Sequence, residues 1–232
     1  MPPKKNGIDL DKLDLTRIYT PEELALINNK LKTHINFENG RLLPVSQAPI
    51  ANEAVVHEIS RQLGNWNVET GQNGVVTTSQ GGFNFSVNGK RKIRAPHVAF
   101  IPENILSSLD KDQLWSFNGQ PFTPIFVVEV INVSNDRILN EVDTRFKNDY
   151  FANGTSVRLG WLIDPKNHAI WTYKNNNNEN APVRQKCNWE DLNGGDILPG
   201  FTLNISMVEE IISQDQEEME EMEANDDNSD LI

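Results

Sequence analysis

The sequence predicts an α/β or α+β fold in which helices flank a mixed central sheet, giving three layers. Three observations support this prediction. Apolar residues recur at helical spacing in 20–31 and 51–63. A nearly continuous β-branched run at 124–133 is typical of a central strand that is buried on both faces. A helical pattern at 134–153 then leads into a strand hairpin at 159–173, so a strand, a helix and a strand form a crossover.

The first half of the chain contains two expected helices with a hairpin between them. Thr20 is a good N-cap, Pro21 suits the first helical position, and Glu23 occupies the capping-box position. The Asn39-Gly40 pair predicts a hairpin turn, because Asn-Gly favours two-residue β-turns. The second helix, 51–63, carries its apolar residues on one stripe.

Short strands are expected after Gly64 at 74–79, 82–88 and 92–101. In 134–153, apolar or aromatic residues recur every four positions, and Gly154 fits the position after a helix end. The remaining expected elements are the hairpin strands 159–164 and 169–173, a strand at 201–205 and a short helix at 207–213.

Charge is distributed unevenly along the 232 residues, whose formal net charge is −12. Nine acidic residues and no Lys or Arg lie in 213–232, so residues 1–212 carry a net charge of only −3. We therefore expect a flexible lead at 1–19, one folded domain at 20–212 and a disordered acidic tail at 213–232. The asparagine-rich stretch 175–180 is expected to be a surface loop.

Several classes of protein are excluded or disfavoured by the composition. The single cysteine, Cys187, rules out a disulfide framework and a multi-cysteine zinc site, and we interpret it as structural. No signal-peptide pattern and no apolar run long enough to span a membrane occur, so we expect a soluble, intracellular protein without membrane contact. The sequence does not decide between a nuclear and a cytoplasmic location, and it does not decide whether the protein forms a homodimer. Phosphate-binding glycine motifs and the GxSxG and HExxH motifs are absent.

Glu129 is the most informative residue, because it lies inside the buried run. Side chains alternate along a strand, so Glu129 shares a face with Val127 and Ile131. An unpaired buried carboxylate would cost several kcal/mol. Glu129 must therefore be neutral, bound to a metal ion, or paired with a cation such as Lys147 or Arg94.

Three further features are candidates for a site around Glu129. His97 begins an expected strand and shares its face with Ala99 and Ile101, although such a histidine is often structural. Lys147 lies near the edge of the apolar stripe of 134–153, where a lysine is normally solvent-facing. The basic run Lys90-Arg91-Lys92-Ile93-Arg94 is suited either to a nucleic-acid backbone or to a solvated hairpin rim.

The order of motifs resembles the Uma-two family of putative restriction endonucleases, within the PD-(D/E)XK nuclease superfamily. The resemblance covers roughly residues 20–207 and depends on the segments APHVAFIP, PIFVVEVINVSNDR, FKNDYFANG, LGWLIDPKNHAIWTYK and LPGFTLNIS. It implies a restriction-endonuclease-like core, with added hairpins, and metal-dependent hydrolysis of DNA with Mg²⁺ or Mn²⁺ as cofactor. Glu129 matches the strand carboxylate of the family and would be a metal ligand.

The sequence departs from the family pattern at several positions. His97 stands where the family has an aspartate, and imidazole suits Mn²⁺ better than Mg²⁺. The family lysine position, counted back from Gly154, falls at Phe146, so Lys147 is one place away. A family acid and a family histidine fall at Asn36 and Asn52.

Two hypotheses follow from this resemblance. In the first, the chain is an endonuclease with an altered site: Glu129 and His97 bind the metal, Lys147 stabilises charge, and Lys90, Arg91 and Lys92 contact the DNA backbone. In the second, the chain is an inactive nuclease-fold protein that binds DNA or another protein. A small-ligand-binding α/β domain is a third interpretation, without a motif of its own.

Overall fold

The computed structural model describes residues 48–87, 92–116, 119–175 and 182–213, together with 13–14, 17–20, 23, 27 and the backbone of 35–38 and 41–44. Most of the expected lead, most of the asparagine-rich stretch, Lys90, Arg91 and residues 214–232 lie outside these residues. The capping box at Thr20 is confirmed: the Glu23 backbone N–H donates to Thr20 Oγ1 (3.3 Å), and the Thr20 N–H donates to Glu23 Oε2 (2.9 Å).

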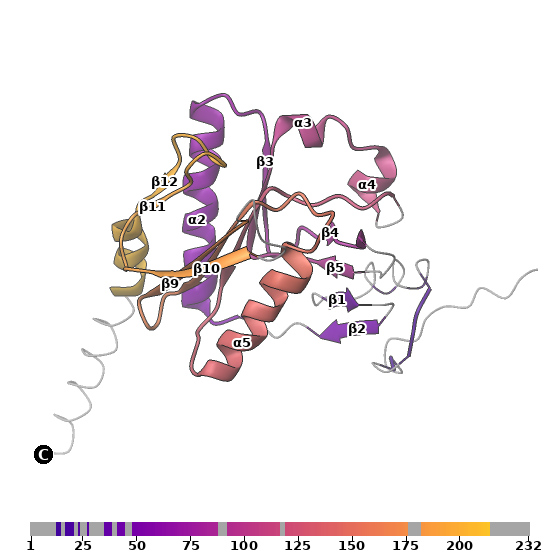
Figure 1. The fold of residues 1–232 in the computed structure, drawn as a ribbon, viewed down its shortest axis with the longest axis horizontal. Helices are drawn as coiled ribbons and strands as arrows, with labels where there is room; N and C mark the ends of the chain where they lie inside the picture. Colours follow the sequence, from indigo (N-terminus) through magenta and orange to yellow (C-terminus); the bar gives the residue numbers. More distant parts are fainter. Residues whose placement is uncertain are drawn as a thin grey trace, which may run out of the picture.

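A six-stranded mixed sheet forms the centre of the fold (Figure 1). All neighbouring strands are antiparallel except β7 and β8, which are parallel because the chain crosses over between them. In sheet order the strands are β10 (Pro182–Cys187), β9 (Ala169–Asn175), β8 (Leu159–Asp164), β7 (Phe126–Val130), β6 (Val98–Ile101) and β3 (Val75–Thr78).

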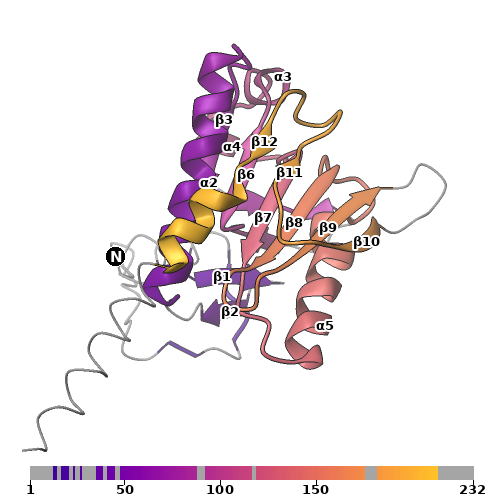
Figure 2. The same ribbon diagram turned by 90° about the vertical axis from the view of Figure 1, so that its left-hand side faces the viewer.

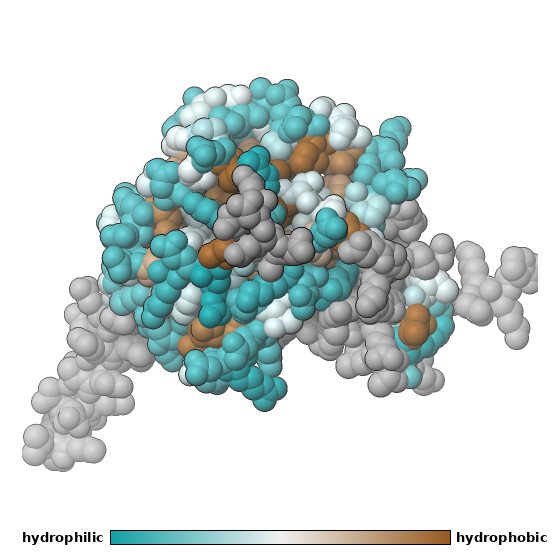
Figure 3. Space-filling model, in the orientation of Figure 1, coloured by the Kyte–Doolittle hydropathy of each residue, from teal (hydrophilic) through white to brown (hydrophobic). Residues whose placement is uncertain are grey.

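Helices cover both faces of this sheet, as Figure 2 shows, which confirms the predicted fold class. On one face lie α2 (Ile50–Glu69) and a C-terminal helix at 205–213, and on the other lies α5 (Asp136–Arg145), which continues into a π-helical turn, η3 (Phe146–Tyr150). The segment between β6 and β7 contains the short helices α3 (Glu103–Leu106) and α4 (Lys111–Trp115). On the face that Figure 3 shows, hydrophobic residues form small patches among mostly hydrophilic residues, several of them near α3.

Two smaller sheets complete the fold. The four-stranded sheet has the order β2 (Arg41–Pro44), β1 (Ile35–Glu38), β5 (Lys92–Arg94) and β4 (Phe83–Asn84), and its hairpin of β1 and β2 agrees with the Asn39-Gly40 prediction. The two-stranded sheet pairs β11 (Leu192–Asn193) with β12 (Thr202–Leu203).

Each face of the central sheet has its own hydrophobic core. The residues Phe126, Val128 and Val130 of β7 pack on the α2 side, and Val127 packs on the α5 side. The alternation predicted for this strand is therefore confirmed. Glu129 belongs to the α5 side and is 1% exposed.

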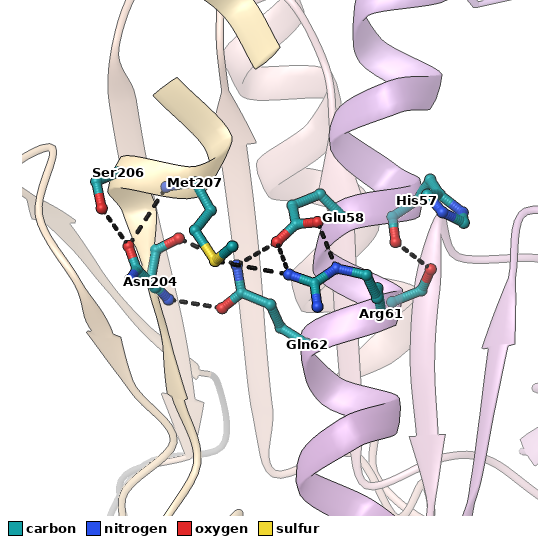
Figure 4. Close-up of polar contacts among 8 residues, drawn as sticks. His57, Glu58, Arg61, Gln62, Asn204, Ser206 and Met207 are labelled. Carbon is teal, nitrogen blue, oxygen red and sulfur yellow. Dashed lines mark hydrogen bonds and ion pairs between the residues drawn. The ribbon is translucent and has the colours of Figure 1, made fainter. Parts of the chain in front are cut away.

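Polar contacts attach the C-terminal helix to α2, as Figure 4 shows. Gln62 donates from Nε2 to the carbonyl of Asn204 (3.1 Å) and accepts at Oε1 from the Asn204 backbone N–H (2.8 Å). Arg61, which donates two hydrogen bonds of 2.7 Å to Glu58 within α2, also donates to the sulfur of Met207 on the C-terminal helix (3.5 Å). These contacts fix the helix on the face opposite to Glu129.

Several expected boundaries were wrong: the expected strands 82–88 and 201–205 are reduced to β4 and β12, the expected helix 207–213 begins at residue 205, and three larger differences follow. Helix α2 extends beyond Gly64 to Glu69, because Trp66 is buried and its Nε1 donates to the Pro199 carbonyl (3.1 Å). The expected strand 92–101 is two strands, β5 and β6, in different sheets, with Pro96 between them. The expected helix 134–153 spans only 136–145 as an α-helix before the π-helical turn.

Candidate functional site

Within the described residues, three donors contact the side chain of Glu129: His97 from the start of β6, and Arg145 and Tyr150 from the continuous helix α5–η3. His97 Nδ1 lies 2.5 Å from Glu129 Oε2, and Arg145 Nη1 lies 3.3 Å from Oε1. The Tyr150 hydroxyl also donates to Oε1. Both carboxylate oxygens therefore have a donor, and we call these four residues the Glu129 cluster.

Strand register places His97 beside Glu129. Strands β6 and β7 are antiparallel, and Val98 is opposite Val128. The residue before Val98 and the residue after Val128 therefore lie at the same end of the sheet. Since side chains alternate, His97 and Glu129 both point toward the α5 side.

The π-helical turn brings Arg145 and Tyr150 to the same carboxylate. The Phe151 backbone N–H donates to the Phe146 carbonyl at 2.8 Å, which is the five-residue spacing of a π-helix. This wider turn lets residues five apart share one side of the helix. Such turns occur frequently at functional sites.

The Glu129 carboxyl group is ionised despite its burial. Burial opposes ionisation, but the charge and hydrogen bond of His97, the charge of Arg145 and the Tyr150 hydroxyl lower the pKa of Glu129 to about 2. Burial likewise acts to lower the pKa of His97, yet the Glu129 carboxylate outweighs it and the pKa of His97 is raised. Burial and the Glu129 charge raise the pKa of Tyr150, so its hydroxyl keeps its proton and remains a donor.

A second ionic group lies beside the first and is centred on Asp149. Arg94 donates to Asp149 Oδ2 from Nε at 2.9 Å and approaches it with Nη2 at 2.8 Å, and Lys92 Nζ donates to Oδ1. We call these three residues the Asp149 cluster. Asp149 precedes Tyr150 in η3, and its charge helps to raise the pKa of Arg145, so the two clusters are electrostatically coupled.

The predicted site residues are brought together only in part. Glu129 and His97 converge. Lys147, in contrast, forms an ion pair with Asp143 (2.6 Å), and within the described residues it is not among the groups that contact Glu129. Lys92 is paired with Asp149, whereas the structure does not describe Lys90 and Arg91.

Sequence reasoning missed Arg145, Asp149 and Tyr150 as members of the site. Tyr150 fits the four-residue spacing of apolar and aromatic residues in 134–153, which predicts a core position, and no local pattern singles out Arg145. The sequence offered one signal: the family lysine position falls at Phe146, one residue before Lys147. This displacement indicated that the helix is irregular there.

This set of donors does not fit a divalent metal ion. Glu129 is the only carboxylate in its cluster, and the Arg145 guanidinium 3.3 Å from it would repel a dication. Among the residues that the structure describes, no group of three or more histidines, cysteines and carboxylates could hold a metal ion.

A hollow of about 810 Å³ lies along the C-terminal helix, on the α2 face of the sheet and away from Glu129. None of the described helices has both the length and the apolar character needed to cross a membrane.

Comparisons with known proteins identify the family. The Uma2 family, described as "Putative restriction endonuclease", matches residues 21–206. A solved structure from Anabaena variabilis, described as a putative nuclease, is 12% identical with a TM-score of 0.56, over 79% of this chain and 95% of that chain. At this identity the likeness shows the fold alone. The comparison with curated proteins finds no match. Restriction-endonuclease-like families generally use divalent metal ions. Because the family match extends over most of its length, the chain belongs to the Uma2 family of putative restriction endonucleases and has a nuclease fold.

Proposed function

We propose that this chain is a nuclease-fold protein that binds DNA without hydrolysing it. The observation that carries the proposal is the state of Glu129, whose two oxygens are engaged by His97, Arg145 and Tyr150. DNA is the proposed ligand because nucleases of this kind act on it and because the basic run at 90–94 reaches the site through Lys92 and Arg94.

The charge balance around Glu129 supports the loss of hydrolysis. Mg²⁺ is normally bound through one or two carboxylates together with substrate phosphates. Here His97 replaces the second carboxylate, and Arg145 supplies a fixed positive charge at Glu129. A buried charge that is already paired gains little from a metal ion and would have to give up its existing partners to bind one.

A metal-dependent endonuclease remains the second candidate, and one observation favours it. His97 and Glu129 lie side by side at the same end of β6 and β7, as the two metal ligands of that hypothesis would, although a metal ion would have to separate the Nδ1 and Oε2 atoms that contact each other at 2.5 Å. In this alternative Arg145 takes the place that the sequence suggested for Lys147.

A plasmid-nicking assay with Mg²⁺ and with Mn²⁺ separates the two candidates. The native chain is compared with Glu129→Ala and with His97→Asp, and the fold of each variant is checked by circular dichroism and melting. We expect no nicking by the native chain with either metal, together with a shift of duplex DNA in a gel that contains EDTA. Nicking by the native chain that disappears in Glu129→Ala would establish the endonuclease and refute the proposal. Absence of any DNA shift would also refute it.

A further inference from the structure

The Glu129 and Asp149 clusters together contain more positive than negative groups. Their permanent cations are Lys92, Arg94 and Arg145, against the carboxylates Glu129 and Asp149. His97 adds a further positive charge when it is protonated. Glu53 lies at the exposed start of α2, and its negative charge helps to raise the pKa of His97. Among the described residues the two clusters alone carry a net charge of +1; with Glu53 included the sum is zero when His97 is neutral and +1 when His97 is protonated.

Positive and negative groups differ in how far they reach the surface. The side chains of Arg145, His97 and Lys92 are 40%, 23% and 18% exposed, whereas Arg94 (9%) is about as buried as the carboxylates of Asp149 and Glu129 (7% and 2%). The two acids therefore lie beneath Arg145, His97 and Lys92. A ligand that approaches this site meets the cations first.

We infer that the two clusters form a metal-independent site for a DNA backbone phosphate, bound by Arg145 with help from Lys92 and His97. This inference rests on the proposed function and names the part of the DNA that is bound, a backbone phosphate. Arginine suits this role because its planar guanidinium can offer two parallel N–H groups to a phosphate. Only Nη1 of Arg145 contacts Glu129, and the side chain is partly exposed, so further N–H groups can be offered to a ligand.

Glu129 and Asp149 are positioning residues in this arrangement. Glu129 holds Arg145 and His97, and Asp149 holds Lys92 and Arg94, so the cations are ordered before a ligand arrives. Prior ordering reduces the entropy lost on binding. Because the contacts are to phosphate, the site should bind different DNA sequences with similar affinity.

The test is a titration of a short DNA duplex by fluorescence anisotropy, in EDTA and at several salt concentrations. Arg145→Gln removes the proposed phosphate contact. Arg137→Gln is a matched control, because Arg137 lies on the same helix, is 87% exposed and pairs only with Glu141 among the described residues. We expect Arg145→Gln to weaken binding roughly tenfold or more and to reduce the salt slope by about one, with little effect of Arg137→Gln.

Several outcomes would overturn the inference. Equal losses in the two variants, or none, would place the DNA elsewhere, and loss of binding in EDTA would show that a metal ion is required. Lys92→Gln, which leaves the Glu129 cluster intact, provides a second variant if Arg145→Gln melts much earlier than the native chain, and unchanged binding in Lys92→Gln would then count against the site. Nicking activity refutes the proposed function, whereas the comparison of Arg145 with Arg137 in EDTA tests the phosphate site separately.

Discussion

Replacing Glu129 with glutamine should remove a pH-dependent part of the stability of this protein. The folded protein lowers the pKa of Glu129 from 4.5 to about 2. Because the folded value is the lower one, the stabilisation is complete above the unfolded pKa and is lost as the pH falls from 4.5 toward 2. At 1.36 kcal/mol per unit, the shift corresponds to about 3 kcal/mol at neutral pH.

Urea unfolding at a series of pH values measures this contribution. At pH 7 the native chain should be more stable than Glu129→Gln by about 3 kcal/mol, and the two free energies of unfolding should converge as the pH falls below 4.5. Glu141→Gln is the control, because Glu141 is 60% exposed and pairs with Arg137 at the surface. Its effect should stay within about 0.5 kcal/mol. A difference between native and Glu129→Gln that stays constant from pH 7 to 3 would refute the electrostatic account of the cluster.

Three other substitutions test separate contacts, each by the free energy of unfolding. Tyr150→Phe removes the hydroxyl that donates to Glu129 and should cost about 1–3 kcal/mol, with a smaller loss on acidification than in the native chain. Gly160→Ala would place a methyl carbon 2.5 Å from the ring of Phe146 and should destabilise the protein by about 1–3 kcal/mol; an unchanged stability would mean that the ring can move aside. Gln62→Ala removes both hydrogen bonds to the backbone before the C-terminal helix and should cost about 1–3 kcal/mol without altering DNA binding.

Much of the central sheet could be predicted from the sequence because its signals are local. The branched run around Glu129 predicted a buried strand, and alternation alone correctly assigned Phe126 and Val127 to opposite faces. The hairpin of β8 and β9 was recognised from two apolar strands around one short turn. Edge strand β10 was missed, because its side chains are mostly exposed and show no clear alternation.

The helical register at the site could not be predicted, because it depends on contacts distant in sequence. Phe146 stacks on Tyr173 with ring centroids 4.0 Å apart, and Tyr150 reaches Glu129, so both ends of the turn are fixed by the sheet. An uninterrupted α-helix would place Arg145 and Tyr150 on different sides. The sequence therefore favoured Lys147, whereas the structure brings Arg145 to Glu129.

The pairing of Glu129 with His97 could not be predicted from local sequence patterns either. This pairing determines the charge of the site. An aspartate at position 97 would set two carboxylates against each other, and such a pair needs a metal ion or a shared proton. A histidine removes one negative charge and adds a donor, so the cluster balances its charge without an ion. Arg145 completes this balance from the helix side. Restoring a metal site should therefore require changes at both positions, since an aspartate introduced alone would still face the Arg145 guanidinium.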